Sequence, residues 1–227
     1  MSTIVNPSIF KFLIDLKKNN TREWFADNKD YYLKEEKKIK EFFTTINDEL
    51  SKIDNIGGMK AYRIYRDIRF SKDKTPYKTY ISCSYKRATE ALRGGYHLEI
   101  TPGGSFLAAG FWQPNKEDLF RIRKEFELDR SYIEKILSDK KFTKLFEGFH
   151  TRNSLKVAPT GFDKNHPNID LIRKKDFIVL RKFTDKEVLS KDFHTTVINS
   201  FKAVRPFFDY MSDVLTTNLN GESILEE

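Results

Sequence analysis

A change in the spacing of apolar residues at Gly57 and Gly58 constrains the fold of this chain more than any other sequence feature. Before the two glycines, apolar side chains recur every three or four residues, as on one buried face of a helix. After them, apolar and polar side chains alternate, which is typical of a half-buried strand. Helical patterns therefore frame a group of mid-chain strands. This segregation predicts an α+β fold with a mainly antiparallel sheet packed against N-terminal and C-terminal helices.

Two helices are expected before the glycines. Asn6 is a suitable N-cap and Pro7 suits the first helical position, where its missing N–H costs nothing. Thr21 caps a second helix, whose apolar spacing continues over residues 30–53. Near the other end of the chain, a last helix is expected over residues 193–217, and Pro206 should kink or interrupt it.

Strands are expected where the two-residue alternation runs between turn-forming residues. They cover residues 59–65, 77–86, 96–101, 105–112 and 177–183. The short connections at Gly94-Gly95 and Gly103-Gly104 predict antiparallel pairing. We therefore expect one α+β domain spanning residues 1–227.

Composition indicates in which compartment of the cell this domain is expected. No stretch approaches the ~20 consecutive apolar residues that a membrane span needs, and the first residues lack the pattern of a secretory signal. Cys83 is the one cysteine, so no intrachain disulfide is available. Its alternation with Ile81 and Tyr85 predicts a buried structural thiol. The expected location is the reduced cytoplasm.

Positive charge is concentrated in one part of the sequence. The net charge of the chain is +8. Residues 60–93 carry ten basic and three acidic side chains, a net of +7, whereas residues 1–59 carry ten of each. A local excess of this kind is what anion binding requires. The centre of this region, residues 63–78, is the candidate binding loop.

The candidate loop combines arginine forks, which suit bidentate recognition of phosphate or carboxylate, with lysine point charges. The residues assigned to ligand binding are Arg63, Arg66, Asp67, Arg69, Lys72, Lys74, Tyr77 and Lys78. Asp67 and Asp73 can hold individual cations in place. The competing interpretation is a rigid surface turn in which these ion pairs are purely structural.

A second group of candidates lies on the predicted strand 96–101. His97 and Glu99 are two residues apart and therefore share one face, an arrangement that suits acid–base chemistry or metal ligation. A partly solvated strand histidine is the competing interpretation. Tyr96, His97 and Glu99 are assigned as positions supporting the ligand site. The chain has no HExxH, Walker A or dinucleotide-binding pattern, so we expect no metal and no cofactor.

Residues 66–79 (RDIRFSKDKTPYKT) resemble the signature of a bacterial and fungal protein family named domain of unknown function 2461. The resemblance extends to residues 19–25, to Tyr96-His97 with Gly110-Phe111-Trp112, and to residues 159–162. It covers about residues 10–208 and implies a single α+β domain. It brings no activity and no catalytic residue.

Three functions fit these observations. The first is binding of a phosphate-bearing or otherwise anionic small ligand at residues 63–78. The second is nucleic-acid binding, with Tyr65, Tyr77 or Tyr80 stacking on bases. The third is a protein-interaction domain without a catalytic site. Cations converging on a concavity favour a small ligand, and cations spread over a face favour a polymer.

Overall fold

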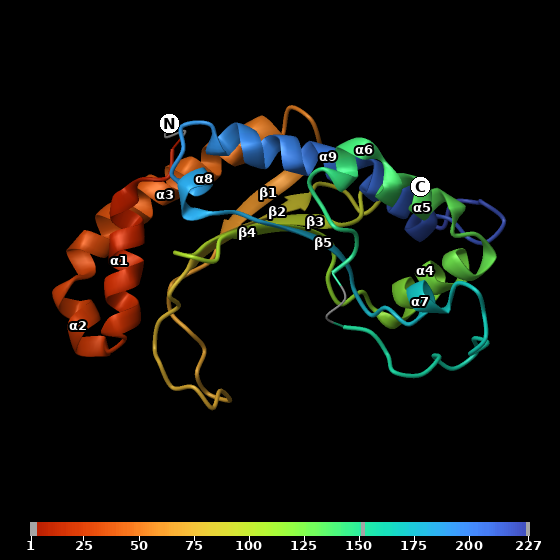
Figure 1. Ribbon diagram of the computed structural model, residues 1–227, viewed down its shortest axis with the longest axis horizontal. Coiled ribbons are helices and arrows are strands. Elements are labelled where there is room, and N and C mark those ends of the chain that lie inside the picture. The colour runs from red at the N-terminus through yellow and green to blue at the C-terminus, as the bar shows by residue number, and fades with distance from the viewer. Residues whose placement is uncertain (1–3, 151–152, 226–227) are drawn as a thin grey trace. The chain divides into compact units, whose positions relative to one another are not determined.

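The computed structural model describes residues 4–150 and 153–225. The elements follow in the order α1 (Pro7–Lys18), α2 (Arg22–Asp27), α3 (Lys29–Leu50), β1 (Ile56–Ala61), β2 (Ile81–Arg87), β3 (Gly95–Ile100), β4 (Phe106–Phe111), α4 (Lys116–Leu128), α5 (Ser131–Ser138), α6 (Lys140–Thr143), α7 (Ile169–Ile172), β5 (Phe177–Lys182), α8 (Asp185–Val188) and α9 (Phe193–Thr216) (Figure 1). The strands form one antiparallel sheet in sequence order, β1-β2-β3-β4-β5. The predicted α+β fold is confirmed. None of the described helices is long and apolar enough to cross a membrane.

The chain divides into two compact units, each assembled from separate segments. The first contains the residues up to Lys86 together with His97–Leu107 and Lys182–Asn199. The second contains Arg87–Tyr96, Ala108–Arg181 and the residues from Ser200 onward. Strands β3 and β4 and helix α9 contribute residues to both units, and the assignment of a single domain stays a prediction.

In the first unit, the predicted caps begin the N-terminal helices. The Asn6 side chain accepts a hydrogen bond from the Ser8 amide at the start of α1, and Thr21 does the same for Trp24 in α2. The predicted second helix is divided at Asn28, where α3 begins. Helix α3 packs on β1, and the Tyr85 hydroxyl of β2 donates a hydrogen bond to the Phe43 carbonyl of α3. One face of β2 is thereby covered.

The second unit has its own aromatic core, built on α9. The Tyr96 ring lies 4.8 Å from that of Phe201, and the Phe111 ring lies 5.5 Å from that of Phe207. Helix α9 runs without a break through Pro206, so Pro206 does not interrupt the helix, and the alternative of a kink stays a prediction. Buried apolar side chains on both sides of the proline, such as Val204 and Phe208, hold the helix in place.

Strands β1 and β2 differ most from the predicted strands. The predicted strand 59–65 begins at Ile56 and ends at Ala61 in β1, so Gly57 and Gly58 lie within the strand, and the predicted strand 77–86 begins at Ile81 in β2. Beyond these ends the two arms are joined by a hydrogen bond from the Tyr62 amide to the Ser82 carbonyl and by an isolated antiparallel bridge between Tyr65 and Tyr77. The intervening polar residues bond to one another instead of to a neighbouring strand.

Cys83 is fully buried, as predicted. Burial raises the pKa of its thiol to about 11, so the side chain is neutral and poorly nucleophilic near pH 7. Cys83 therefore belongs to the core.

Candidate functional site

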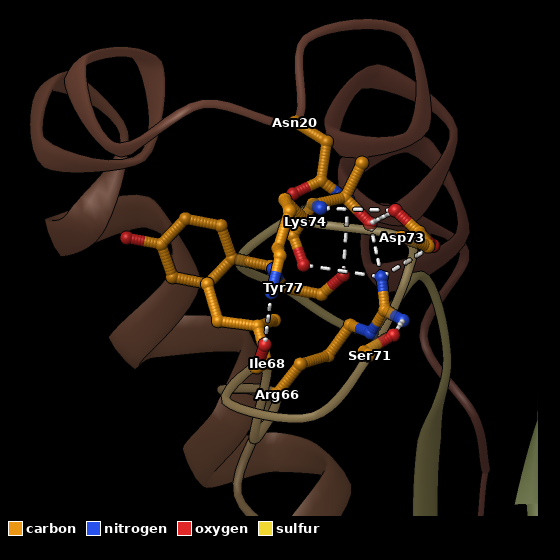
Figure 2. Close-up of polar contacts among 8 residues, drawn as sticks. Asn20, Arg66, Ile68, Ser71, Asp73, Lys74 and Tyr77 are labelled. Atoms are coloured by element: carbon orange, nitrogen blue, oxygen red, sulfur yellow. Dashed lines mark hydrogen bonds and ion pairs between the residues drawn. The ribbon is translucent and has the colours of Figure 1, made fainter.

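The connection between β1 and β2 leaves the sheet as a long loop, residues 62–80, called the stapled loop below (Figure 1). Its centre is the guanidinium of Arg66, which bonds to three other loop residues (Figure 2). The Nη1 atom donates to Asp73 Oδ2 at 2.5 Å, to the Thr75 carbonyl at 3.1 Å and to the Thr75 hydroxyl. The Nη2 atom donates to Ser71 Oγ at 3.4 Å. The Arg66 side chain thus connects the outgoing arm of the loop to residues 71–75 by hydrogen bonds.

Asp73 strengthens the same closure. Its Oδ1 atom accepts from the Thr75 amide at 2.9 Å and from the Thr75 hydroxyl at 2.8 Å. These two hydrogen bonds, followed by the one from Arg66, lower the pKa of Asp73 to about 2. The carboxylate is therefore charged at every ordinary pH and remains a partner for Arg66.

Arg69 and Lys74 are also engaged within the loop. The Arg69 guanidinium donates two hydrogen bonds to the Asp67 carboxylate, from Nε to Oδ1 at 3.0 Å and from Nη2 to Oδ2 at 2.7 Å. Hydrogen bonds from the Arg69 side chain and amide lower the pKa of Asp67 to about 2. Lys74 Nζ donates to the Ile68 carbonyl at 3.0 Å (Figure 2). Of the six cations predicted for ligand binding, Arg66 and Arg69 are therefore neutralised by aspartates of the loop, and Lys74 is held by a backbone carbonyl.

Tyr77 anchors the loop to the N-terminal helices. The Asn20 amide donates to the Tyr77 carbonyl at 2.9 Å, and its carbonyl oxygen accepts from the Tyr77 amide at 3.1 Å (Figure 2). The buried Tyr77 ring stacks on Phe25, with centroids 4.0 Å apart. This geometry fixes the returning arm of the loop and leaves the Tyr77 ring no face for a ligand.

The other predicted cations lack an acidic partner. Among the described residues, Arg63, Lys72, Lys74 and Lys78 form no ion pair. Lys78 Nζ donates to the Arg63 carbonyl at 3.0 Å and lies 5.5 Å from the Tyr62 ring centroid. Burial lowers the pKa of Lys78, and the positive charge of Arg63 lowers it further, while Glu99 opposes the shift. Two like charges thus stand together at the base of the loop.

The sheet beside this base carries a chain of polar side chains. Ser84 of β2 and His97 of β3 alternate with buried residues and share the face that the helices leave uncovered. The Tyr62 hydroxyl lies 3.1 Å from Ser84 Oγ, which lies 3.0 Å from His97 Nδ1. The Tyr62 and His97 rings are 6.1 Å apart. Ser84, His97 and Glu99 are called the polar sheet face below.

Burial perturbs the titrating groups on this face. It lowers the pKa of His97, which is therefore neutral at pH 7. It raises the pKa of Glu99, against the opposing effects of a hydrogen bond from Thr101 and the charge of Lys78. It also raises the pKa of Tyr80, and the charge of Glu99 adds to that shift. Clusters of perturbed groups on an accessible surface are typical of functional sites.

The structure brings some of the predicted site residues together and separates others. Arg63, Lys78, His97 and Glu99 belong to one neighbourhood through the contacts above. Tyr96 points to the opposite side of β3, where it is buried against Phe201 and Phe208. Arg66, Asp67, Arg69 and Lys74 bond within the stapled loop, and Lys72 is exposed on it.

Sequence reasoning did not select Tyr62 or Ser84, and it named Tyr80 only as a ring that could stack on bases. The signal for Ser84 was present, because the alternation that places Cys83 and Tyr85 in the core places Ser82, Ser84 and Lys86 on the other face. The pairing of Ser84 with His97 depends on the register of β2 against β3, which the strand pattern leaves open.

The fold and site together define an α+β protein with an internally stapled basic loop beside a polar sheet face. Residues 8–210 match the family model described as conserved hypothetical protein, domain of unknown function 2461. The chain belongs to this family, and the resemblance found in the sequence is confirmed. No curated protein and no solved structure matches the chain.

Proposed function

We propose that the protein binds a phosphate-bearing or otherwise anionic small ligand where Arg63 and Lys78 meet the polar sheet face. The observation that carries this proposal is the pair of neighbouring cations, which form no ion pair among the described residues. Holding two like charges together costs free energy, and a bound anion would offset that cost. Arg66 and Arg69 differ, because each has an aspartate of the loop as its partner.

The neighbouring groups suit an anion with oxygen atoms. Tyr62 supplies a hydroxyl that can donate a hydrogen bond to the anion, and Arg63 supplies a planar fork for bidentate contact. Lys78 is partly withdrawn from water, which strengthens its attraction for an anion. The hydrogen bond from Lys78 Nζ to the Arg63 carbonyl holds the Lys78 ammonium in place without a ligand, which lowers the ordering cost at binding.

The test is a calorimetric titration with pyrophosphate and with inorganic phosphate. Arg63→Gln and Lys78→Gln are each expected to weaken pyrophosphate binding about fivefold, the effect of roughly 1 kcal/mol for a partly exposed ion pair. Arg69→Gln is the matched control, since its charge is already paired with Asp67. Equal loss of affinity in all three variants would point to a diffuse charge effect and against a site at Arg63 and Lys78.

A second candidate function, binding of single-stranded nucleic acid, is favoured by one observation at the loop tip. Phe70 is 96% exposed, and it lies in sequence between the basic residues Arg69 and Lys72. A rigidly presented aromatic ring beside cations is the arrangement on which bases stack. This ring takes the role that was assigned to Tyr77, which is buried.

Fluorescence anisotropy with a labelled oligothymidylate tests the second candidate. If the tip binds single strands, Phe70→Ala should weaken binding by about 1–3 kcal/mol, the range measured for base–aromatic stacking. The affinity of the unaltered protein should also fall steeply between 50 and 200 mM salt, about 0.7 log units per log unit of salt for each phosphate contact. An affinity unaffected by both changes rules this function out.

A further inference from the structure

The hydrogen-bond chain on the polar sheet face leaves one ring nitrogen of His97 unengaged. Nδ1 is bonded to Ser84 Oγ, which is in turn bonded to the Tyr62 hydroxyl. Among the described residues, Nε2 has no hydrogen-bond partner, and it is not one of the buried atoms left without one. Nε2 therefore keeps some exposure to solvent on the partly buried ring.

The direction of this chain sets the chemistry of His97. When Nδ1–H donates to Ser84 Oγ and the Ser84 hydroxyl donates to Tyr62 Oη, the lone pair of the neutral ring lies on Nε2. The ring is neutral because burial lowers the pKa of His97. A neutral imidazole with a partly exposed Nε2 lone pair is a nucleophile.

Two further groups complete the arrangement. Glu99 lies two residues from His97 on the same strand face, and burial raises its pKa, which favours the protonated acid. Lys78 is close enough to Glu99 and to Arg63 for both charges to shift its pKa. A nucleophile and an acid of β3 thus lie near two cations of the stapled loop in the first unit.

We propose that His97 accepts a phosphoryl group from a phosphate monoester bound at Arg63 and Lys78, a step that rests on the function proposed above. The Nε2 lone pair forms a bond to phosphorus as the bond from phosphorus to the ester oxygen breaks. Glu99 gives its proton to that oxygen, and the alcohol leaves. Arg63 and Lys78 stabilise the charge on the phosphoryl oxygens.

Water then completes the hydrolysis. The Glu99 carboxylate takes a proton from water as the water oxygen attacks phosphorus, and the bond from phosphorus to Nε2 breaks. Inorganic phosphate is released, His97 regains its lone pair and Glu99 is protonated again. Ser84 is a positioning residue in this scheme, because it holds the proton on Nδ1 and touches no reacting atom.

The experiment uses the full chain with p-nitrophenyl phosphate and phenyl phosphate as probes. We expect release of phosphate from both and, after a rapid quench, a phosphorylated His97 peptide whose modification is labile to acid and stable to base. His97→Asn retains a donor in the position of Nδ1 while removing Nε2, and should abolish the phosphopeptide and turnover. His97→Gln is the second variant in case the first does not fold.

The Glu99→Gln variant tests whether Glu99 acts as the acid or has only a structural role. Phenolate is the poorer leaving group and needs the proton, so this variant should slow formation of the phosphorylated His97 peptide from phenyl phosphate at least tenfold more than from p-nitrophenyl phosphate. Ser84→Ala should lower kcat with little change in KM. Equal slowing of phosphopeptide formation from both esters by Glu99→Gln would remove Glu99 from its role as the acid.

The outcomes for the two proposals are distinguishable. Pyrophosphate binding without a phosphopeptide at His97 and without turnover overturns phosphoryl transfer and leaves the anion site standing. Absence of both binding and turnover overturns both proposals. Turnover that persists in both His97 variants assigns the activity to other residues or to a contaminant and also overturns this inference.

Discussion

Replacing Gly110 by alanine is expected to lower the free energy of unfolding by about 3 kcal/mol or more, the largest stability change among the substitutions considered. Gly110 of β4 has φ +141°, and a Cβ atom there would lie 2.1 Å from the Phe177 carbonyl oxygen and 2.8 Å from Ile178 Cα. Both contacts are with the backbone of β5, which cannot move aside as a side chain can. Overpacking of this kind costs roughly 1–3 kcal/mol, and the left-handed backbone adds about 1–2 kcal/mol.

A thermal melt with a matched glycine variant checks this expectation. In a chain of this size, 3 kcal/mol corresponds to a fall in Tm of about 6–12 °C. Gly104→Ala is the control, because its Cβ would meet nothing closer than Thr101 Cγ2 at 3.7 Å. If the Tm of Gly110→Ala lay within 1 °C of the Tm of the control, β4 and β5 would not approach each other as closely as described.

The elements that could be predicted from the sequence are those whose signals are local. The caps at Asn6 and Thr21 work through side-chain oxygens two or three residues from their partners, so the sequence alone identifies them. The mid-chain strands follow from alternation that each strand carries by itself. Pro206 does not end α9, because the packing of this long amphipathic helix overrides the local preference of proline.

The sequence proposes a candidate site but does not resolve its parts. Charge density drew attention to residues 63–78, since clustering is visible in one dimension, and their role in binding stays a prediction. Which cations are occupied depends on loop conformation, as Arg66 meets Asp73 seven residues away and Lys78 meets the Arg63 carbonyl fifteen residues away. The link from Ser84 to His97 depends on strand register, which is set by the whole hairpin.

Arg66→Met is expected to destabilise the stapled loop far more than Arg69→Met, although both remove one arginine from the same motif. The Arg66 side chain is 24% exposed and holds Ser71, Asp73 and Thr75 at once, whereas that of Arg69 is 76% exposed and holds Asp67 alone. Loss of the Arg66 hydrogen bonds should lower the free energy of unfolding by about 1–2 kcal/mol. Loss of an exposed pair such as that of Arg69 should change little.

Limited chymotrypsin digestion reports on the loop itself, because the exposed Phe70 is a cleavage site in its centre. The Arg66→Met chain should be cut at Phe70 several times faster than the unaltered chain, and the Arg69→Met chain at nearly the unaltered rate. Had the arginines been gathered only for a ligand, removing either would relieve repulsion and leave the loop equally resistant or more so. Faster cleavage of the Arg66→Met chain alone would show that Arg66 stabilises the conformation of the loop. Arg63 and Lys78 would then remain the candidates for binding the anion.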